Sequence, residues 1–248
     1  MEKRTSKIRL GLFIFLLGFI GILTILTMEL PLPQYIKDEI YKIFTPFEFK
    51  LLSLINPTFL LVIAVTVGTL LYDKVNFKLP ILENLIWKLN NKINYQSILK
   101  FGALGGIISG VLISLFSLAY ISHIPKELSE IETPVLARFL YGGITEEILL
   151  RFGFMTLIVW ILHKILNTHK DSIYWTGIII SSLLFGIAHL PIVFMSVENP
   201  SITLMTYIIL GNSIGGIIFG WLYWKKGLET AMIAHIFTHI VFLIFGNL

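Results

Sequence analysis

The 248-residue sequence contains no cysteine and few charged side chains. Without cysteine there can be no disulfide, no thiolate metal site and no cysteine nucleophile. Charged residues make up 14% of the chain, whereas soluble domains typically carry about a quarter. Hydrophobic residues reach 56%, and the mean hydropathy is +0.84. This composition predicts an integral membrane protein whose apolar surface is covered by the lipid bilayer.

The sequence also lacks the alternation of apolar and polar residues that a membrane β-barrel requires. It has instead seven apolar runs long enough to cross roughly 30 Å of hydrocarbon as helices. We therefore predict an all-α, polytopic transmembrane helical bundle. The runs are Leu10–Met28, Leu51–Tyr72, Phe101–Ile121, Pro134–His163, Ile173–His189, Ile202–Trp224 and Leu228–Phe245.

The fourth run, Pro134–His163, is longer than one straight span needs. We expect it to break near Arg151–Gly153, which would give eight spans, or seven with one bent. The first run follows the basic stretch "MEKRTSKIR" and is not followed by a small-residue cleavage site. It is therefore interpreted as a retained span rather than a signal peptide.

The stretch "PILENLIWKLNNKI" has an amphipathic pattern, with Leu82, Leu85, Ile86 and Leu89 on one helical stripe and lysines opposite. Such a pattern is typical of a helix lying in the headgroup layer, and a soluble linker helix is the alternative. No second domain is visible. Within one integral-membrane domain, residues 1–100 are expected to hold N-terminal spans and this interfacial helix, and residues 101–248 the core that carries the motifs.

The lysines and arginines predict the orientation. They are dense in the first nine residues and in the connection 73–100, and they are outnumbered by acids in the connection 29–50. The positive-inside rule therefore places the N-terminus in the cytoplasm. A seven-span chain puts Lys225 and Lys226 inside as well, and an eight-span chain puts them outside. The net charge of +4 fits attraction to anionic lipid better than nucleic-acid binding. Lys, Ile and Asn usage suggests a bacterial plasma membrane.

Glycines recur at four-residue spacing in two of the runs. Such rows allow close approach of helix backbones and predict tight packing faces. A hinge or a substrate groove is the alternative. The rows are Gly102, Gly106 and Gly110 in one run, and Gly211 with Gly215 and Gly216 with Gly220 in another.

The stretch "GGITEEILLR" places three ionisable groups inside the fourth apolar run. A charge at mid-membrane costs a few kcal/mol, so each needs a partner or a function. Glu147 and Arg151 are four residues apart and can pair on one helix face. Glu146 points about 100° away round an α-helix and has no partner from that pair. A structural ion pair beside a neutral Glu146 is the alternative to a functional site.

The histidines fall into two groups. Three stand at span ends or in loops, where an imidazole needs no special explanation: His123, His163 and His169. The other three are inside apolar runs: His189, His235 and His239. His235 and His239 are one turn apart, a spacing that metal-binding helices use and that two hydrogen-bonded core histidines would equally satisfy.

Buried carboxylates and imidazoles together supply what amide hydrolysis requires. A carboxylate takes a proton from water, and imidazoles hold that water, bind a metal or stabilise the oxyanion. No GxSxG motif is present, and Ser and Thr in membrane helices usually bond back to helix carbonyls. The sequence therefore favours a water nucleophile inside a hydrated pocket.

These residues resemble the CPBP family of intramembrane proteases, which includes the CAAX prenyl endopeptidases and the bacterial Abi proteins of bacteriocin immunity. The family pattern is EExxxR, then FxxxH, then HxxxN or HxxxD. It corresponds here to Glu146–Arg151, Phe185–His189 and His235–His239, in the same order. The resemblance covers about residues 136–242. It implies an endopeptidase acting on a membrane-bound peptide or protein substrate.

The resemblance also implies roles for the residues of the first motif. Glu146 corresponds to the general base that activates water. Glu147 and Arg151 correspond to the pair that orients this base and steadies the helix. Phe152 follows the arginine where the family often has a small residue.

For the histidines, the resemblance implies that His189 shares the water or a metal, and that His235 and His239 contact a metal or the developing oxyanion. His239 stands where the family usually has Asn or Asp. Both a zinc-dependent and a metal-free glutamate mechanism have been proposed for the family. His189, His235 and His239 keep the zinc possibility open.

Three other functions remain open from the sequence. One is a non-catalytic membrane scaffold, such as a bacteriocin-immunity protein. Another is a proton-coupled transporter that uses Glu146 and the histidines as a relay, although no inverted repeat is visible. The third is a haem protein with His189 or His235 as an axial ligand.

Overall fold

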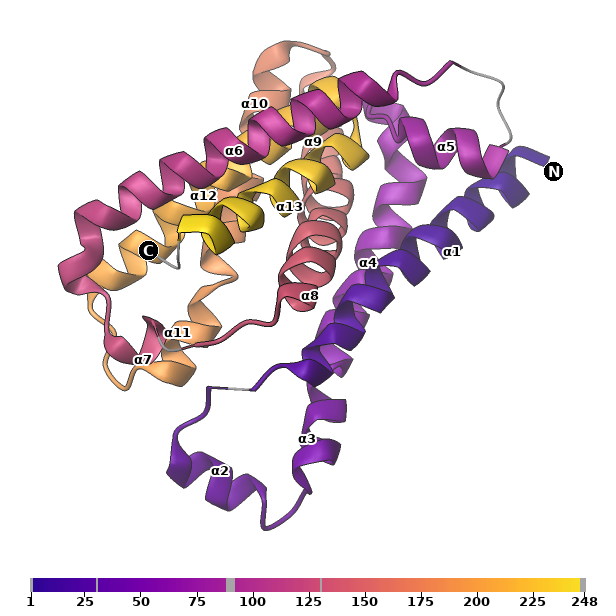
Figure 1. The fold of residues 1–248 in the computed structure, drawn as a ribbon. Helices are drawn as coiled ribbons and strands as arrows, with labels where there is room; N and C mark the ends of the chain where they lie inside the picture. Colours follow the sequence, from indigo (N-terminus) through magenta and orange to yellow (C-terminus); the bar gives the residue numbers. More distant parts are fainter. Residues whose placement is uncertain (1, 30, 88–91, 130, 246–248) are drawn as a thin grey trace.

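The computed structural model describes residues 2–29, 31–87, 92–129 and 131–245, and every regular element among them is helical (Figure 1). The α-helices are α1 (Glu2–Leu23), α2 (Gln34–Ile40), α3 (Pro46–Ser53), α4 (Ile55–Leu71), α5 (Pro80–Trp87), α6 (Tyr95–Tyr120), α7 (Lys126–Ser129), α8 (Val135–Ala137), α9 (Thr156–Leu166), α10 (Asp171–Ile187), α11 (Leu190–Ser196), α12 (Ile202–Lys226) and α13 (Leu228–Phe245). Short 3-10 segments η1 (Thr24–Thr27), η2 (Tyr72–Val75) and η3 (Ile121–His123) extend α1, α4 and α6, and two π-helical segments are η4 (Arg138–Glu146) and η5 (Ile148–Met155).

Seven helical segments of the described chain are long and apolar enough to cross a membrane. The all-α polytopic bundle predicted from the apolar runs is therefore confirmed. The spans are Ser6–Thr27, Pro46–Val75, Tyr95–His123, Val135–Leu166, Asp171–Ser196, Ile202–Lys226 and Leu228–Phe245.

The fourth span does not break where the sequence suggested. It is one continuous span of 32 residues, Val135–Leu166, and it passes through 151–153 as the π-helix η5. Hydrogen bonds from i to i+5 place more residues in each turn than an α-helix has. A π-helix therefore advances less per residue, which lets a long segment cross without a kink. The expected break near Arg151–Gly153 and the eight-span alternative were wrong.

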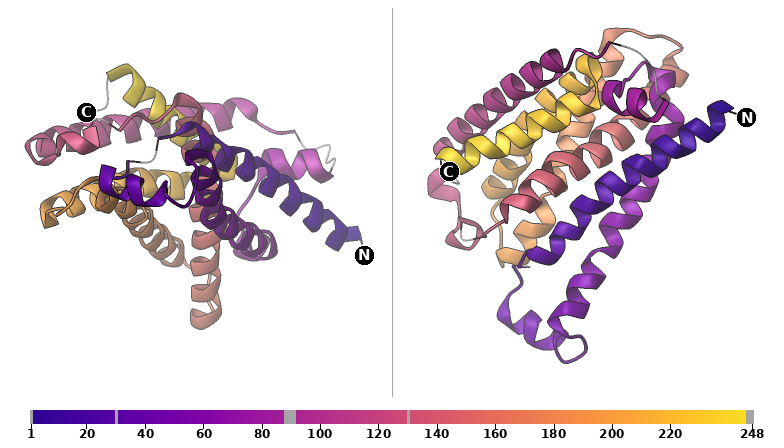
Figure 2. Two further views of the ribbon diagram at one scale, coloured as in Figure 1. Left: turned by 90° about the horizontal axis from the view of Figure 1, so that it is seen from below. Right: turned by 45° about the vertical axis from the view of Figure 1, so that its right-hand side comes forward.

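This fourth span lies at the centre of the bundle (Figures 1 and 2). α1 and α4 pack on one side of it, and α13, α10 and α12 pack on the other. Of the 18 most apolar consecutive residues of this span, half are buried inside the protein, compared with 22% for the span built on α6. Glu147 and Arg151 of the fourth span are buried and therefore shielded by neighbouring helices rather than placed against lipid.

The glycine rows are packing faces, as predicted. On α6, a methyl group added at Gly102 would stand 2.5 Å from Ile233 of α13, and one at Gly110 would stand 2.6 Å from Val241. On α12 the two rows face different helices, since Gly215 lies against Ser109 of α6 and Gly216 against Ser182 of α10. The rows thus hold α6, α10, α12 and α13 at close range.

The predicted amphipathic helix forms as α5 and begins at Pro80. Leu82 is buried and Ile86 packs against the core, but Leu85 is 58% exposed, so the predicted stripe does not all face the bundle. On an α-helix Leu85 and Ile86 lie to opposite sides of the direction of Leu82, and α5 contacts α1 and α13 on the side of Ile86. Leu89 lies outside the described residues. An outward Leu85 suits a helix in the headgroup layer, where it would meet lipid.

A carboxylate from α13 caps the N-terminal end of α5. Glu229 Oε1 accepts hydrogen bonds from the backbone N–H groups of Ile81 and Leu82, both at 2.9 Å. The first N–H groups of a helix have no partner within the helix, so such a cap satisfies them. The N–H of Leu228 donates to the carbonyl oxygen of Lys78 at 3.1 Å and ties the same two segments together.

We predict that Glu229→Ala loosens α5 without disrupting the bundle. Loss of a cap costs about 0.5–2 kcal/mol. Hydrogen exchange measured by mass spectrometry should show faster exchange in the peptide containing Ile81 and Leu82, while peptides from α10 keep their protection. Unchanged exchange in that peptide would contradict the capping role.

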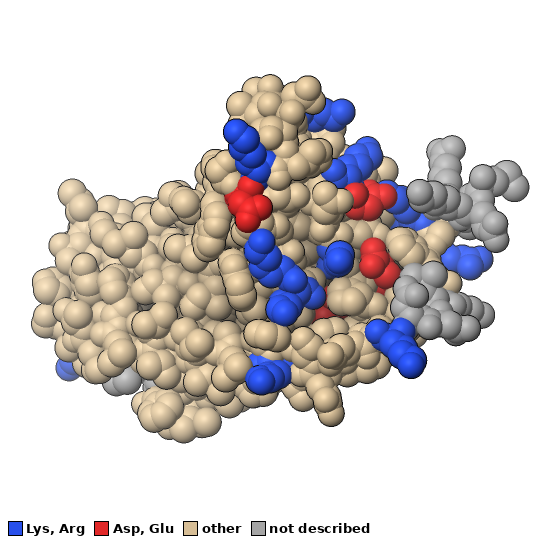
Figure 3. Space-filling view, turned by 90° about the horizontal axis from the view of Figure 1, so that it is seen from above, with Lys and Arg blue, Asp and Glu red and all other residues tan. Residues whose placement is uncertain are grey.

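In a seven-span chain, the N-terminus lies at the same end of the bundle as several other helix ends. This end holds the start of α1, the end of α4, the whole of α5, the start of α6, the end of α9, the start of α10, the end of α12 and the start of α13. We call this the basic end. Figure 3 shows Lys and Arg gathered over it. Ion pairs join its helices: Lys7 with Asp73 at 2.7 Å, and Lys225 with Asp171 at 3.7 Å. Lys225 and Lys226 share an end with the N-terminus, as a seven-span chain requires.

Candidate active site

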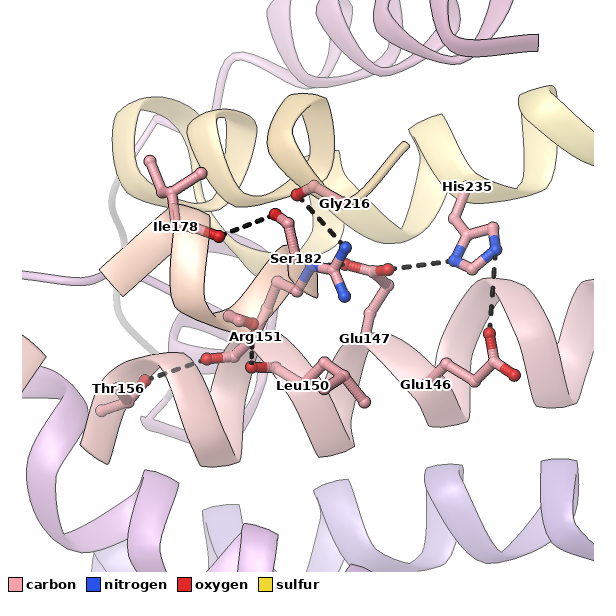
Figure 4. Close-up of polar contacts among 10 residues, drawn as sticks. Glu146, Glu147, Leu150, Arg151, Thr156, Ile178, Ser182, Gly216 and His235 are labelled. Atoms are coloured by element: carbon pink, nitrogen blue, oxygen red, sulfur yellow. Dashed lines mark hydrogen bonds and ion pairs between the residues drawn. The ribbon is translucent and has the colours of Figure 1, made fainter. Parts of the chain in front are cut away.

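The two glutamates and the arginine of the fourth span are the centre of a buried polar cluster (Figure 4). Glu147 and Arg151 are 0% and 1% exposed, and Arg151 Nε lies 3.3 Å from Glu147 Oε2. The ion pair predicted from their spacing is therefore confirmed. Because the pair is withdrawn from both lipid and water, each charge depends on the other for compensation.

Arg151 is held by two further helices. Its Nη2 donates to the carbonyl oxygen of Gly216 in α12 at 3.2 Å. Its guanidinium lies 4.8 Å from the ring centroid of Phe185 in α10 and 5.5 Å from that of Phe219 in α12. Aromatic faces attract a guanidinium, so Arg151 joins the fourth span to α10 and α12.

His235 of α13 lies between the two glutamates (Figure 4). Its Nδ1 is 3.0 Å from Glu147 Oε1, and its Nε2 is 3.9 Å from Glu146 Oε2. Since a carboxylate only accepts, Nδ1 carries the proton and donates to Glu147, and in the neutral ring Nε2 is left as an acceptor. As expected, Glu146 takes no part in the Glu147–Arg151 ion pair, but the two glutamates reach the same imidazole from two sides.

The arrangement of the backbone explains this convergence. Successive residues of a π-helix are separated by a smaller angle than the 100° of an α-helix, because each turn holds more residues. Glu146 ends η4 and Glu147 begins the junction to η5. Thr145 and Thr156 hydroxyls donate to carbonyl oxygens five residues earlier, Leu140 at 3.2 Å and Arg151 at 3.1 Å.

His239 lies one turn beyond His235, and the two rings stack with centroids 5.0 Å apart and planes 15° apart. The shared face expected from their spacing is thus present. Neither ring nitrogen of His239 has a hydrogen-bond partner among the described residues. Its Nε2 occupies the space beside Gly142, where a Cβ would come within 2.6 Å.

His189 lies at the junction of α10 and α11 and is oriented by its own helix. Its Nδ1 donates to the carbonyl oxygen of Phe185 at 2.8 Å. The ring of Phe185 stands edge-on to both His189, at 4.9 Å, and His235, at 5.7 Å. The structure therefore brings His189 to the aromatic wall of the cluster, with Phe185 in contact with both imidazoles.

The three histidines do not fit a zinc site as they are arranged. Within the described ranges, no three His, Cys, Asp or Glu side chains are grouped to hold a metal ion. Lone pairs of imidazole nitrogens lie in the ring plane, so the stacked rings of His235 and His239 do not direct them to one point. His189 also commits Nδ1 to a carbonyl. Zinc binding by His189, His235 and His239 stays a prediction.

Three residues of the cluster were not singled out from the sequence. Phe219 stacks on His235, with centroids 4.6 Å apart. Gly216 supplies the carbonyl that Arg151 binds, and Gly142 gives room to His239. The sequence does mark the two glycines, because Gly142 begins the stretch "GGITEE" and Gly216 belongs to a glycine row. No pattern distinguishes Phe219 from the other apolar residues of its helix.

A family model described as type II CAAX prenyl endopeptidase Rce1-like matches residues 129–241. The match covers less than half of the chain, and this segment is similar to the Rce1-like family. The resemblance inferred from the three motifs is thereby confirmed, since all of them fall inside the match. No curated protein and no solved structure matches the chain. The Rce1-like segment holds the fourth to seventh spans, and α1 to α6 precede it.

We predict that Gly142→Ala destabilises the Rce1-like segment through His239. The new methyl group would collide with the imidazole, and overpacking of a core typically costs about 1–3 kcal/mol. The double variant Gly142→Ala/His239→Ala removes the colliding ring and should regain most of the thermal stability lost by Gly142→Ala. Thermal unfolding in detergent micelles measures both. If His239→Ala does not relieve Gly142→Ala, the close packing of these two residues is refuted.

Proposed function

We propose that this protein is an intramembrane endopeptidase that hydrolyses a peptide bond of a membrane-bound or lipidated peptide, using a water molecule activated by Glu146. The observation that carries the proposal is the flanking of His235 by two carboxylates within the membrane-spanning bundle. The similarity of residues 129–241 to a family of CAAX prenyl endopeptidases agrees with it.

Glu146 is assigned as the base because its carboxylate, unlike that of Glu147, is not committed to an ion pair with Arg151. Glu147 is committed to His235 and Arg151, whereas Glu146 has only the 3.9 Å approach to His235 Nε2. The side chain of Glu146 is 18% exposed, while that of Glu147 is fully buried. A water beside this pair would donate one hydrogen to Glu146 and one to Nε2 and direct its lone pair outward.

The reaction then needs few other groups. The water oxygen attacks the carbonyl carbon of the peptide, and Glu146 takes the proton. As the tetrahedral intermediate collapses, the C–N bond breaks and Glu146 returns this proton to the leaving amine. Glu147 fixes the tautomer of His235 and stabilises the partial positive charge that the ring gains while Nε2 accepts a hydrogen bond from the reacting water. Arg151 compensates Glu147. We derive no step through a metal ion, because the histidines do not fit one as arranged.

We also propose that the basic end faces the cytoplasm. Lys74, Lys78, Lys164 and Lys170 lie at this end, together with the N-terminus, in a seven-span chain. The positive-inside rule favours this orientation. A lipidated peptide anchored in the cytoplasmic leaflet would then approach the cluster of Glu146, Glu147 and His235 from the basic end.

The test is cleavage by purified protein in liposomes. Peptides carrying a lipidated cysteine near the C-terminus, and the same peptides without lipid, are analysed by mass spectrometry. We expect the lipidated peptides to be cut, with no loss of rate after treatment with a zinc chelator. Loss with the chelator and recovery with added zinc would overturn the metal-free mechanism. Failure to cut any peptide would favour the scaffold or the transporter.

A further inference from the structure

A separate pocket of about 300 Å³ opens at the basic end of the bundle. Three parts of the chain form it. They are α5 with the loop before it, the start of α6 with the residues before it, and the end of α12. None of the residues discussed for catalysis lines it. Its lining is Lys78, Pro80, Glu83, Asn84, Lys92, Ile93, Asn94, Ser97, Ile98 and Lys226.

The lining carries three lysines and one carboxylate, so its charge is positive. None of the ammonium groups of Lys78, Lys92 and Lys226 is among the ion pairs found in the described part of the chain. Lys226 is half-buried, with its Nζ 3.9 Å from the ring centroid of Phe101. Glu83 carries the one carboxyl of the lining, and burial raises its pKa.

Uncommitted polar groups complete the pocket. Asn84 Oδ1 is buried and accepts no hydrogen bond among the described residues, so it can accept one from a ligand hydroxyl. The start of α6 adds the positive end of a 26-residue helix, where the Asn94 side chain accepts a hydrogen bond from the Ser97 N–H at 2.8 Å. Helix N-termini attract anions through their free N–H groups.

The height of the pocket in the membrane indicates the kind of anion. Lys226 is the last residue of the sixth span, and Ser97 is in the first turn of the third. Pro80 follows the second span by a few residues. The pocket thus lies at the headgroup layer, between spans, and basic pockets in that position bind anionic lipid headgroups.

We infer that this pocket binds the phosphate and a hydroxyl group of an anionic lipid headgroup, with Lys78, Lys92 and Lys226 on the phosphate and Asn84 on the hydroxyl. Such a lipid would join α5, α6 and α12 at one end of the bundle. The site is independent of the proposed peptidase activity, because it shares no residue with the Glu146 cluster.

The test is lipid binding by the delipidated full-length protein in neutral detergent. Phosphatidylglycerol, phosphatidylcholine and glycerol 3-phosphate are titrated separately and followed by native mass spectrometry and thermal unfolding. We expect phosphatidylglycerol alone to bind tightly and raise the Tm. Each lysine near a membrane surface contributes about a fivefold change in affinity. Lys92→Gln and Lys226→Gln should therefore each weaken binding about fivefold, and Asn84→Leu should weaken it severalfold.

Lys225→Gln is the matched control, because Lys225 is adjacent in sequence to Lys226 but pairs with Asp171 and does not line the pocket. It should leave the affinity unchanged. Equal weakening by Lys225→Gln and Lys92→Gln would show diffuse attraction and overturn the site. Binding of glycerol 3-phosphate as tight as that of the lipid would overturn the lipid as its ligand. Lys92 is exposed before α6 begins, so Lys92→Gln keeps the test valid if Lys226→Gln fails to fold.

Discussion

Glu146→Gln should abolish peptide cleavage while leaving the protein folded. The amide keeps the size of the side chain but cannot take a proton from water, and loss of a general base typically costs about 10²–10⁴-fold in rate. Stability should change little, since Glu146 forms no hydrogen bond in the described structure and only approaches His235 at 3.9 Å. The rate is measured on lipidated peptide in liposomes, and stability by thermal unfolding.

The matched control for this prediction is Glu132→Gln. Glu132 lies just before the same span, within the Rce1-like segment, and is exposed. Its cleavage rate should equal that of the wild type. If Glu146→Gln cut the peptide at a rate close to that of Glu132→Gln, Glu146 would not be the base, and the proposed mechanism would fail. Loss of cleavage with simultaneous unfolding would also contradict the prediction.

The largest effect on stability is expected at Glu147 and Arg151. Breaking a buried ion pair by removing one partner costs about 3–5 kcal/mol, because the other charge stays buried without compensation. Glu147→Gln and Arg151→Met should each lose stability of this size. The double variant removes both charges and should recover most of it. The free energy of unfolding is measured for all four proteins by SDS titration in mixed micelles, as a double-mutant cycle.

Cleavage separates the structural role of this pair from its catalytic one. In the double variant the amide oxygen introduced by Glu147→Gln still accepts the Nδ1–H of His235, but it no longer stabilises a charged imidazole. We therefore expect the double variant to be stable and to cleave poorly. The control pair is Asp171 with Lys225, at 3.7 Å and largely exposed, where the same cycle should give at most about 1 kcal/mol. Additive losses in the Glu147–Arg151 cycle would refute the coupling.

Much of the fold was predictable because a bilayer imposes a simple rule. Each run of about 20 apolar residues must form a helix to satisfy its backbone groups, so the seven apolar runs correspond to seven spans. The glycine rows predicted close packing faces. The sequence was misleading at 151–153, where local composition gave no sign that hydrogen bonding of the i to i+5 type would carry the span through.

The members of the candidate site were also identified in advance, although its arrangement was not. Glu146, Glu147, Arg151 and the three buried histidines stood out because ionisable groups are costly in lipid. Spacing on a single helix predicted the pairing of Glu147 with Arg151 and the shared face of His235 and His239. Their roles in catalysis and zinc binding by the histidines stay predictions.

By itself, the sequence determined that the chain spans a membrane as helices, which residues in those helices need partners, and which family its C-terminal part resembles. Only the tertiary structure decided that Glu146 and Glu147 share His235, and that Phe185 and Phe219 enclose Arg151. The reason is physical: apolar periodicity specifies which elements form, whereas the direction of a buried side chain depends on helix pitch and on neighbours distant in sequence.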